Sequence, residues 1–193
     1  PMPNPLLYQI NTRITLGELA RDARRPTTFD DIPDALLDQL RTAAFDWLWL
    51  LGVWEPSAYG LEIARRHPEI RRGLVAELPD LEEADIVCSP FSIRGYSPQA
   101  AWGGAPALAR LRERARARGL QLMLDFVPNH IAVDHPWVNE HPEYLVAGTA
   151  ADLAREPSNY VELSSRGQTR VFAHGRDPYF PGWTDTLQLD YRL

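Results

Sequence analysis

Residues 122–137, LMLDFVPNHIAVDHPW, place one acid, Asp125, inside a strand-length apolar run and close the run with Pro128, Asn129 and His130. An ionised carboxylate inside a buried strand is costly unless it is paired or hydrogen-bonded. Pro128 cannot donate to a strand ladder, so it ends the pairing and fixes the direction in which the chain leaves. The acid is therefore either satisfied structurally near a strand end or part of a functional site.

Two further apolar runs of strand length precede this one, and a helical pattern stands before each of the last two runs. The strands are predicted at 6–11, 45–54 and 120–127, and the helices at 32–44 and 105–119. The last two runs carry apolar residues on both faces, which is typical of buried parallel strands. The order β-α-β-insert-α-β predicts right-handed crossovers in a parallel sheet.

The segments between and after these elements differ in character. Residues 55–104 are predicted to be partly helical around 57–77 and loop-like over 88–104. Residues 131–193 are rich in Pro, Gly, Asp and aromatic residues, and they predict an irregular, loop-rich subdomain. Three parallel strands make a poor closed fold, so we expect them to be part of a larger α/β domain.

The bulk composition argues against several classes of protein. The net charge of −6 disfavours a nucleic-acid partner, which needs a concentrated basic surface. No apolar stretch approaches the ~20 residues of a membrane helix, and no leader-like segment opens the sequence. Cys88 is the single cysteine, which favours a reducing compartment. We expect a soluble cytoplasmic protein with no membrane partner.

The position of the acid favours a functional interpretation. Asp125, Asn129 and His130 lie at the carboxyl end of a predicted parallel strand, where barrel and open α/β enzymes gather their chemistry. In the preceding strand, Trp47 and Trp49 are predicted to be core residues. The sequence thus predicts a site at the carboxyl edge of the sheet.

Four motifs in order resemble one enzyme family. DFVPNH at 125–130 resembles the first signature region of the α-amylase family, glycoside hydrolase family 13. The stretch 45–54 resembles the second barrel strand of that family, and 89–104 resembles the loop that carries its conserved tyrosine. TLQLDY at 186–191 resembles a short region found late in the inserted domain of the family. The matches cover most of the chain.

The resemblance implies an α/β fold that is a partial TIM (β/α)8 barrel. Residues 1–130 would supply its first three strands, and residues 131–193 an irregular domain inserted after the third strand. Retaining hydrolysis or transfer needs two carboxylates about 5 Å apart. In the family the nucleophilic Asp lies on the fourth strand and the acid/base Glu on the fifth, so both are expected beyond Leu193. The chain alone is therefore expected to be inactive.

The resemblance also implies roles for residues that are present. His130 would donate a hydrogen bond to a sugar hydroxyl beside the scissile bond, and Tyr96 would stack on the apolar face of that sugar. Asp125 would be the buried acceptor that holds strand ends and side chains of the pocket in place. Trp54 and Asp190 are further candidates for substrate contact. No cofactor is expected, although Asn129 is a candidate calcium ligand because it serves so in some members.

Three functions stay open from the sequence. The first is the N-terminal part of a retaining α-glycoside hydrolase or transglycosidase in carbohydrate metabolism. It would bind an α-glucoside or α-linked oligosaccharide and pair with the remainder of its own barrel. The second is a non-catalytic carbohydrate-binding or scaffold protein that uses Tyr96 and His130. The third is a metal hydrolase built on His130, His135 and His141, a set that lacks a recognised ligand spacing.

Overall fold

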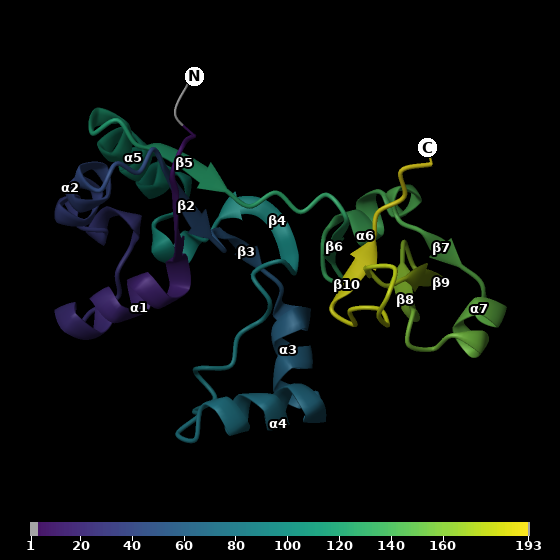
Figure 1. The fold of residues 1–193 in the computed structure, drawn as a ribbon. Coiled ribbons are helices and arrows are strands. Elements are labelled where there is room, and N and C mark those ends of the chain that lie inside the picture. Colours follow the sequence, from purple (N-terminus) through teal and green to yellow (C-terminus); the bar gives the residue numbers. More distant parts are fainter. Residues whose placement is uncertain (1–3, 193) are drawn as a thin grey trace. The chain divides into compact units, whose positions relative to one another are not determined.

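The computed structural model describes residues 4–192, which divide into two compact units (Figure 1). Unit 1 comprises residues 4–55 and 96–126, and unit 2 comprises residues 56–95 and 127–192. The chain passes between the units within strands β3 (Trp54–Pro56) and β4 (Ile93–Pro98), and again after residue 126. Each unit has its own hydrophobic core.

Unit 1 is an α/β unit around a three-stranded sheet. The strands lie in the order β1 (Leu7–Asn11), β2 (Trp47–Leu51) and β5 (Gln121–Leu124), and both pairings are parallel, as predicted. The helical elements are α1 (Thr12–Ala23), η1 (Phe29–Asp31), α2 (Asp34–Thr42), η2 (Ala100–Trp102) and α5 (Gly104–Ala117). The predicted helices at 32–44 and 105–119 are confirmed as α2 and α5.

The helices of unit 1 cover one face of the sheet. Leu48 and Leu50 of β2 are fully buried in the core that includes apolar residues of α2 and α5. Trp47 and Trp49 point to the opposite face and are only half-buried, and Met123 of β5 is exposed. The expectation that the strands are buried on both faces, with Trp47 and Trp49 in the core, was therefore wrong, because the described helices pack on one side only.

Helix α1 was not predicted from the sequence. Asn11 caps it, with its side-chain oxygen accepting a hydrogen bond from the Ile14 N–H at 3.3 Å. Its buried residues are Thr12 and Leu16 alone. So short an apolar stripe leaves little helical periodicity to read.

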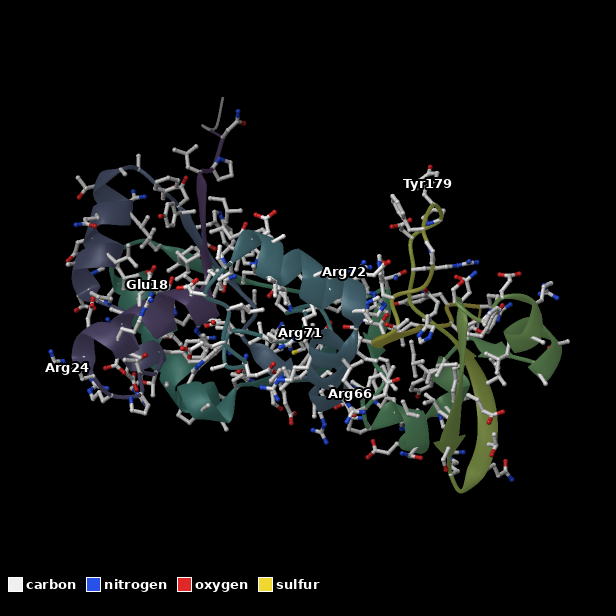
Figure 2. The ribbon with its side chains drawn as sticks, turned by 90° about the horizontal axis from the view of Figure 1, so that it is seen from below. Glu18, Arg24, Arg66, Arg71, Arg72 and Tyr179 are labelled. Atoms are coloured by element: carbon white, nitrogen blue, oxygen red, sulfur yellow. The ribbon has the colours of Figure 1, made fainter. Side chains whose placement is uncertain are left out.

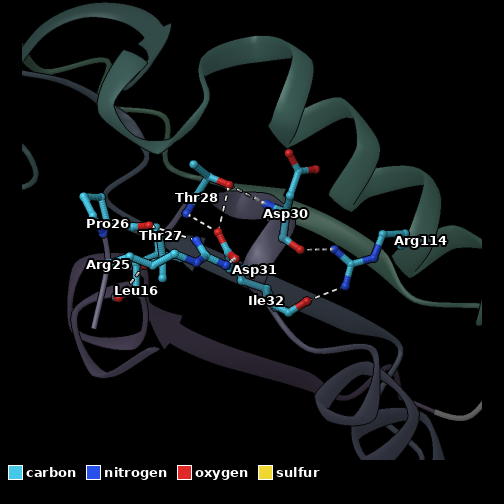
Figure 3. Close-up of polar contacts among 9 residues, drawn as sticks. All are labelled: Leu16, Arg25, Pro26, Thr27, Thr28, Asp30, Asp31, Ile32 and Arg114. Carbon is cyan, nitrogen blue, oxygen red and sulfur yellow. Dashed lines mark hydrogen bonds and ion pairs between the residues drawn. The ribbon is translucent and has the colours of Figure 1, made fainter. Parts of the chain in front are cut away.

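A ladder of ion pairs joins α5 to η1 and α2. Three arginines one helical turn apart face three aspartates with the same spacing: Arg110 with Asp30, Arg114 with Asp34, and Arg118 with Asp34 and Asp38. Arg114 also donates to the main-chain oxygens of Asp30 and Ile32 (Figure 3). In the same view Asp31 accepts from the Thr28 N–H at 2.7 Å and pairs with Arg25.

Unit 2 combines a helical pair with small antiparallel sheets. Helices α3 (Ala58–Arg66) and α4 (Pro68–Glu77) confirm the helix predicted around 57–77. The remaining elements of the unit are β6 (His130–Ala132), α6 (Trp137–Glu140), η3 (Pro142–Tyr144), β7 (Ala147–Gly148), α7 (Ala150–Arg155), β8 (Tyr160–Ser165), β9 (Gln168–Ala173) and β10 (Thr186–Gln188). Strands β7, β9 and β8 form one sheet and β10 pairs with β6, all antiparallel.

Two predicted loop regions contain more regular structure than expected. The stretch 88–104 includes β4 and η2, and the stretch 131–193 includes the antiparallel sheets of unit 2. The sequence IRGYSP of β4 contains glycine and serine and ends in proline, so it is a weak strand signal. Within residues 4–192, no helix has the length and apolar character that a membrane crossing requires.

Candidate functional site

Asp125 is buried at the carboxyl edge of the parallel sheet, and its oxygens have partners in unit 1. Oδ1 accepts a hydrogen bond from the indole N–H of Trp49 at 2.9 Å, and Oδ2 accepts from the Gly52 N–H at 2.6 Å. The main-chain oxygen of Asp125 accepts from the indole N–H of Trp54 at 2.8 Å. Gly52 has a φ of +79°, which favours glycine at this turn. Asp125 thus ties together the ends of β2, β3 and β5.

Trp49 is a partner of the acid that the sequence did not reveal. Trp49 lies opposite Met123 in the parallel register, and Asp125 follows Met123 by two residues. Residues two apart on a strand point to the same face, so the indole and the carboxylate share one side of the sheet. A signal existed in this alternation, but it becomes useful only when the register between the strands is known.

Tyr96 belongs to an aromatic wall, defined here as Trp54, Tyr96 and Phe126 of unit 1. The ring centroids of Tyr96 and Trp54 are 5.2 Å apart with an edge-on angle of 69°, and those of Tyr96 and Phe126 are 6.1 Å apart. The Phe126 side chain is 77% exposed and that of Tyr96 is 44% exposed. The bond from Trp54 to Asp125 fixes one end of this wall. Sequence reasoning had not singled out Phe126.

His130 is buried in unit 2, and both of its ring nitrogens have partners. Nε2 lies 3.2 Å from the main-chain oxygen of Phe91, and Nδ1 lies 3.2 Å from the side-chain nitrogen of Asn129. An amide N–H donated to Nδ1 leaves the proton on Nε2, which then donates to the Phe91 oxygen. Burial lowers the pKa of His130, opposed by the Phe91 carbonyl and by the nearby charge of Asp185. The imidazole is therefore neutral at pH 7.

Asn129 is arranged as a structural hydrogen-bond partner. Its side-chain oxygen accepts from Gln188 Nε2 at 3.0 Å, and its main-chain oxygen accepts from the same nitrogen at 2.8 Å. An amide oxygen has two lone pairs, so the calcium role expected for Asn129 stays a prediction. Among residues 4–192, no group of three or more His, Cys, Asp or Glu is placed to hold a metal ion, and His130, His135 and His141 do not form one.

Asp190 forms a local ion pair. Its two carboxylate oxygens accept from Arg192, from Nε at 2.9 Å and from Nη2 at 2.7 Å. The hydrogen bonds from the Arg192 side chain, followed by that from its backbone N–H, lower the pKa of Asp190 to about 2. The carboxylate is thus ionised and held by the neighbouring guanidinium.

The structure joins some of the predicted site residues. In unit 1, Asp125 contacts Trp54, and Trp54 contacts Tyr96. In unit 2, His130 contacts Asn129. A half-exposed aromatic wall anchored by a buried acid suits the binding of a flat, neutral molecule. Asp125 itself is committed to donors within the protein, so it acts as a positioning residue.

Residues 95–176 match the family model described as alpha amylase, catalytic domain. Two curated relatives are alpha-1,4-glucan:maltose-1-phosphate maltosyltransferases. The relative from Burkholderia pseudomallei is 33% identical over 152 residues, and the match covers 74% of this chain and 12% of that protein. The relative from Cereibacter sphaeroides is 29% identical over 145 residues, covering 74% of this chain and 20% of that protein. The chain thus spans a small part of the length of these relatives.

Solved structures share the fold. The alpha-amylase of Lactobacillus plantarum superposes with a TM-score of 0.59 at 20% identity, over 97% of this chain and 32% of that chain. Trehalose-6-phosphate hydrolase of Bacillus licheniformis superposes with a TM-score of 0.59 at 15% identity, over 97% of this chain and 30% of that chain. These neighbours are TIM-barrel proteins, and the likeness concerns the fold alone.

Proposed function

On the premise of its now confirmed resemblance to the α-amylase family, we propose that this chain supplies the sugar-binding part of a retaining glycoside hydrolase or transglycosidase. Its substrates would be α-glucosides or α-glucans. The observation that carries this proposal is the aromatic wall, which Asp125 anchors at the carboxyl ends of β2 and β5. Pyranose rings present an apolar C–H face that matches the negative face of an aromatic ring.

The proposed fold is the first three strands of a (β/α)8 barrel within residues 1–130, with residues 131–193 as an inserted domain. The parallel order of β1, β2 and β5 supports it. Half-buried Trp47 and Trp49, with exposed Met123, line the sheet face that lacks helices, as the interior face of a barrel would. Further strands of the barrel would cover that face. Residues 56–95 belong to the same compact unit as residues 127–192. This suggests that part of the segment before α5 packs with the inserted domain.

The substrate class is supported by the relatives. Two are named for transfer from maltose-1-phosphate to α-1,4-glucan, and a Culex pipiens protein, 28% identical over 92 residues, is an alpha-glucosidase. Retaining chemistry on such substrates needs a pair of carboxylates. The family pattern places that pair on strands beyond the three of the described parallel sheet. We therefore expect these 193 residues alone to bind sugar without turnover.

His130 has a conditional role in this proposal. Its Nε2–H donates to the Phe91 oxygen, so a sugar hydroxyl must replace that carbonyl or share the proton. Tyr96 is 44% exposed, so part of its ring surface is open to contact. We therefore assign the larger binding role to the ring of Tyr96 and treat contact of sugar with His130, Asp190 and Trp54 as proposals, as are the cytoplasmic location and the absence of a cofactor.

The test is calorimetric titration of the 193-residue chain with maltotriose, with an assay for released glucose. Wild-type protein should bind without release, and Tyr96→Ala should weaken binding by about fivefold through loss of the stacking face. Tyr8→Ala is the matched control, because Tyr8 is a comparably exposed tyrosine that packs on Phe45 elsewhere in unit 1. Hydrolysis by the chain alone, or equal affinity in all three proteins, would contradict the proposal. A non-catalytic sugar-binding protein would give the same binding result. The two functions are distinguished by whether the complete barrel turns over the sugar.

A further inference from the structure

A second aromatic surface lies in unit 2, on residues 177–183, DPYFPGW, named here the aromatic loop. The Tyr179 side chain is 88% exposed and that of Phe180 is 67% exposed. Figure 2 shows Tyr179 at the tip of this loop, pointing away from the ribbon. Adjacent exposed aromatic side chains form an apolar patch, a feature that can mark an interaction surface. Nothing in the site of unit 1 accounts for them.

The tip of the aromatic loop is shaped by hydrogen bonds within the loop and to its neighbour. Oδ1 of Asp177 accepts from the backbone N–H groups of Tyr179 at 2.8 Å and Phe180 at 3.2 Å. The Gly182 N–H donates to the side-chain oxygen of Asn159 at 3.0 Å. Prolines at 178 and 181 restrict the backbone on both sides of the rings. The two aromatic side chains are thus presented by a fixed backbone.

The base of the loop is packed against buried groups. The Trp183 N–H donates to the Gly175 oxygen at 2.8 Å, and the Trp183 ring lies edge-on to His130 with centroids 5.1 Å apart. A Cβ on Gly182 would lie 2.6 Å from the Cβ of His174, so only glycine allows this close approach. A loop anchored in this way loses little conformational entropy when it binds a ligand.

The charge around the loop narrows the class of ligand. Residues 178–183 are uncharged. One base, Arg176, and one acid, Asp177, precede them and a second acid, Asp185, follows shortly after, so the flanking charges are acidic in excess. With a chain charge of −6, these acids disfavour anionic lipid headgroups and acidic peptides. Flat, rigid aromatic rings favour a neutral partner with a flat apolar face. A glucosyl ring has such a face, edged by hydroxyl groups that remain in water.

We propose that the aromatic loop is a second α-glucan contact, in which Tyr179 and Phe180 stack on glucosyl units of a long chain. The proposal rests on the proposed function and deepens it, because it separates binding of long glucans from binding of short α-glucosides at Tyr96. Short sugars would need only the aromatic wall of unit 1. Long glucans would gain affinity from the loop.

The experiment measures retardation of the 193-residue chain in native gels containing glycogen, alongside titration with maltotriose. The double variant Tyr179→Leu/Phe180→Leu keeps apolar side chains but removes the flat faces, and we expect about fivefold weaker glycogen affinity. Tyr179→Phe keeps the ring and should stay within about twofold of wild type. Tyr191→Leu is the matched control, since Tyr191 is another exposed tyrosine of unit 2.

Each outcome decides the proposal. Unchanged glycogen affinity in the double variant, while maltotriose binding still depends on Tyr96, overturns the loop contact and leaves the proposed function standing. Absence of binding to both sugars by wild-type protein overturns both. Sedimentation completes the test: if wild-type protein self-associates and the double variant does not, the loop is a protein contact and the proposal fails.

Discussion

The cores of the two units are built from different kinds of buried residue. Unit 1 has a layered core in which a parallel sheet packs on helices, and its buried residues are almost all apolar. Unit 2 has a smaller apolar core and a larger share of buried polar side chains, including His130, His174 and Ser165. In unit 1 a single buried acid positions the aromatic wall, whereas in unit 2 buried imidazoles hold loops. We therefore expect low pH and amino-acid substitutions to change the stability of the two units by different amounts.

The largest expected effect is that of Asp125→Ala on unit 1. The change leaves the Trp49 indole N–H and the Gly52 N–H without their acceptor in a partly buried place. We expect the free energy of unfolding of unit 1 to fall by about 3 kcal/mol. Native-state hydrogen exchange of β2 and β5 amides measures it. Asp22→Ala, at an exposed position on α1, is the control and should change little.

If Asp125→Ala lowers the free energy of unfolding no more than Asp22→Ala does, the stability of unit 1 does not depend on Asp125. Asp125→Asn sharpens the result, because one acceptor oxygen remains. The stability of Asp125→Asn should lie between that of wild type and that of Asp125→Ala.

The second effect is a pH dependence confined to unit 2. Burial lowers the pKa of both His130 and His174 below the usual 6.5, opposed in each case by a backbone carbonyl and by the charge of Asp185. Below pH 6.5 the unfolded state therefore binds more protons than the folded state. The stability that the two neutral histidines contribute is fully present above pH 6.5, and it is lost as the pH falls from there toward their folded-state pKa values.

Hydrogen exchange at about pH 7.5 and about pH 5.5 tests this window, since it brackets the ordinary histidine pKa. Amides of β8 and β9 should lose protection at the lower pH, beyond the intrinsic change of exchange rate, while those of β2 and β5 should not. In unit 1, hydrogen bonds from Arg25 and Thr28 lower the pKa of Asp31 to about 2, well below this window. Equal loss in both units would break the comparison.

The comparison also shows what sequence can and cannot reveal. Parallel strands β2 and β5 were predictable because each lies in an apolar run of strand length that follows a helical pattern. The hairpin of β8 and β9 was missed, although Arg166 and Gly167 at its turn both have positive φ, as a two-residue hairpin turn requires. An Arg-Gly pair is a weaker signal than Asn-Gly, and the strands around it are largely polar.

Some features of the candidate site could likewise be predicted from the sequence, and others could not. A buried acid before Pro-Asn-His was readable as an anchoring acceptor, because an apolar strand gives a carboxylate few alternatives. Its donors were not readable, since they depend on the register of β2 against β5. The partner of His130, the Phe91 oxygen, comes from a segment far away in sequence. Tertiary contacts of this kind leave no local pattern.

The smallest expected effect is that of Arg114→Ala in the ion-pair ladder of unit 1. Arg114 pairs with Asp34 at 2.7 Å and donates to two main-chain oxygens, but the Asp34 carboxylate is exposed, so solvent screens the pair. Thermal unfolding should show a Tm decrease well below that of Asp125→Ala, and smaller still at high salt. Arg112→Ala, where the exposed arginine pairs with its neighbour Glu113, should leave the Tm unchanged. A larger effect than that of Asp125→Ala would reverse the order proposed here.

The most direct test of the central claim, that the wall anchored by Asp125 receives an α-glucoside, is a crystal structure of the chain with maltotriose. The account predicts a glucosyl ring stacked on Tyr96, with the Trp54 to Asp125 bond intact. A sugar bound elsewhere with the Tyr96 ring uncovered, or a crystal at saturating maltotriose with no sugar bound, would contradict it.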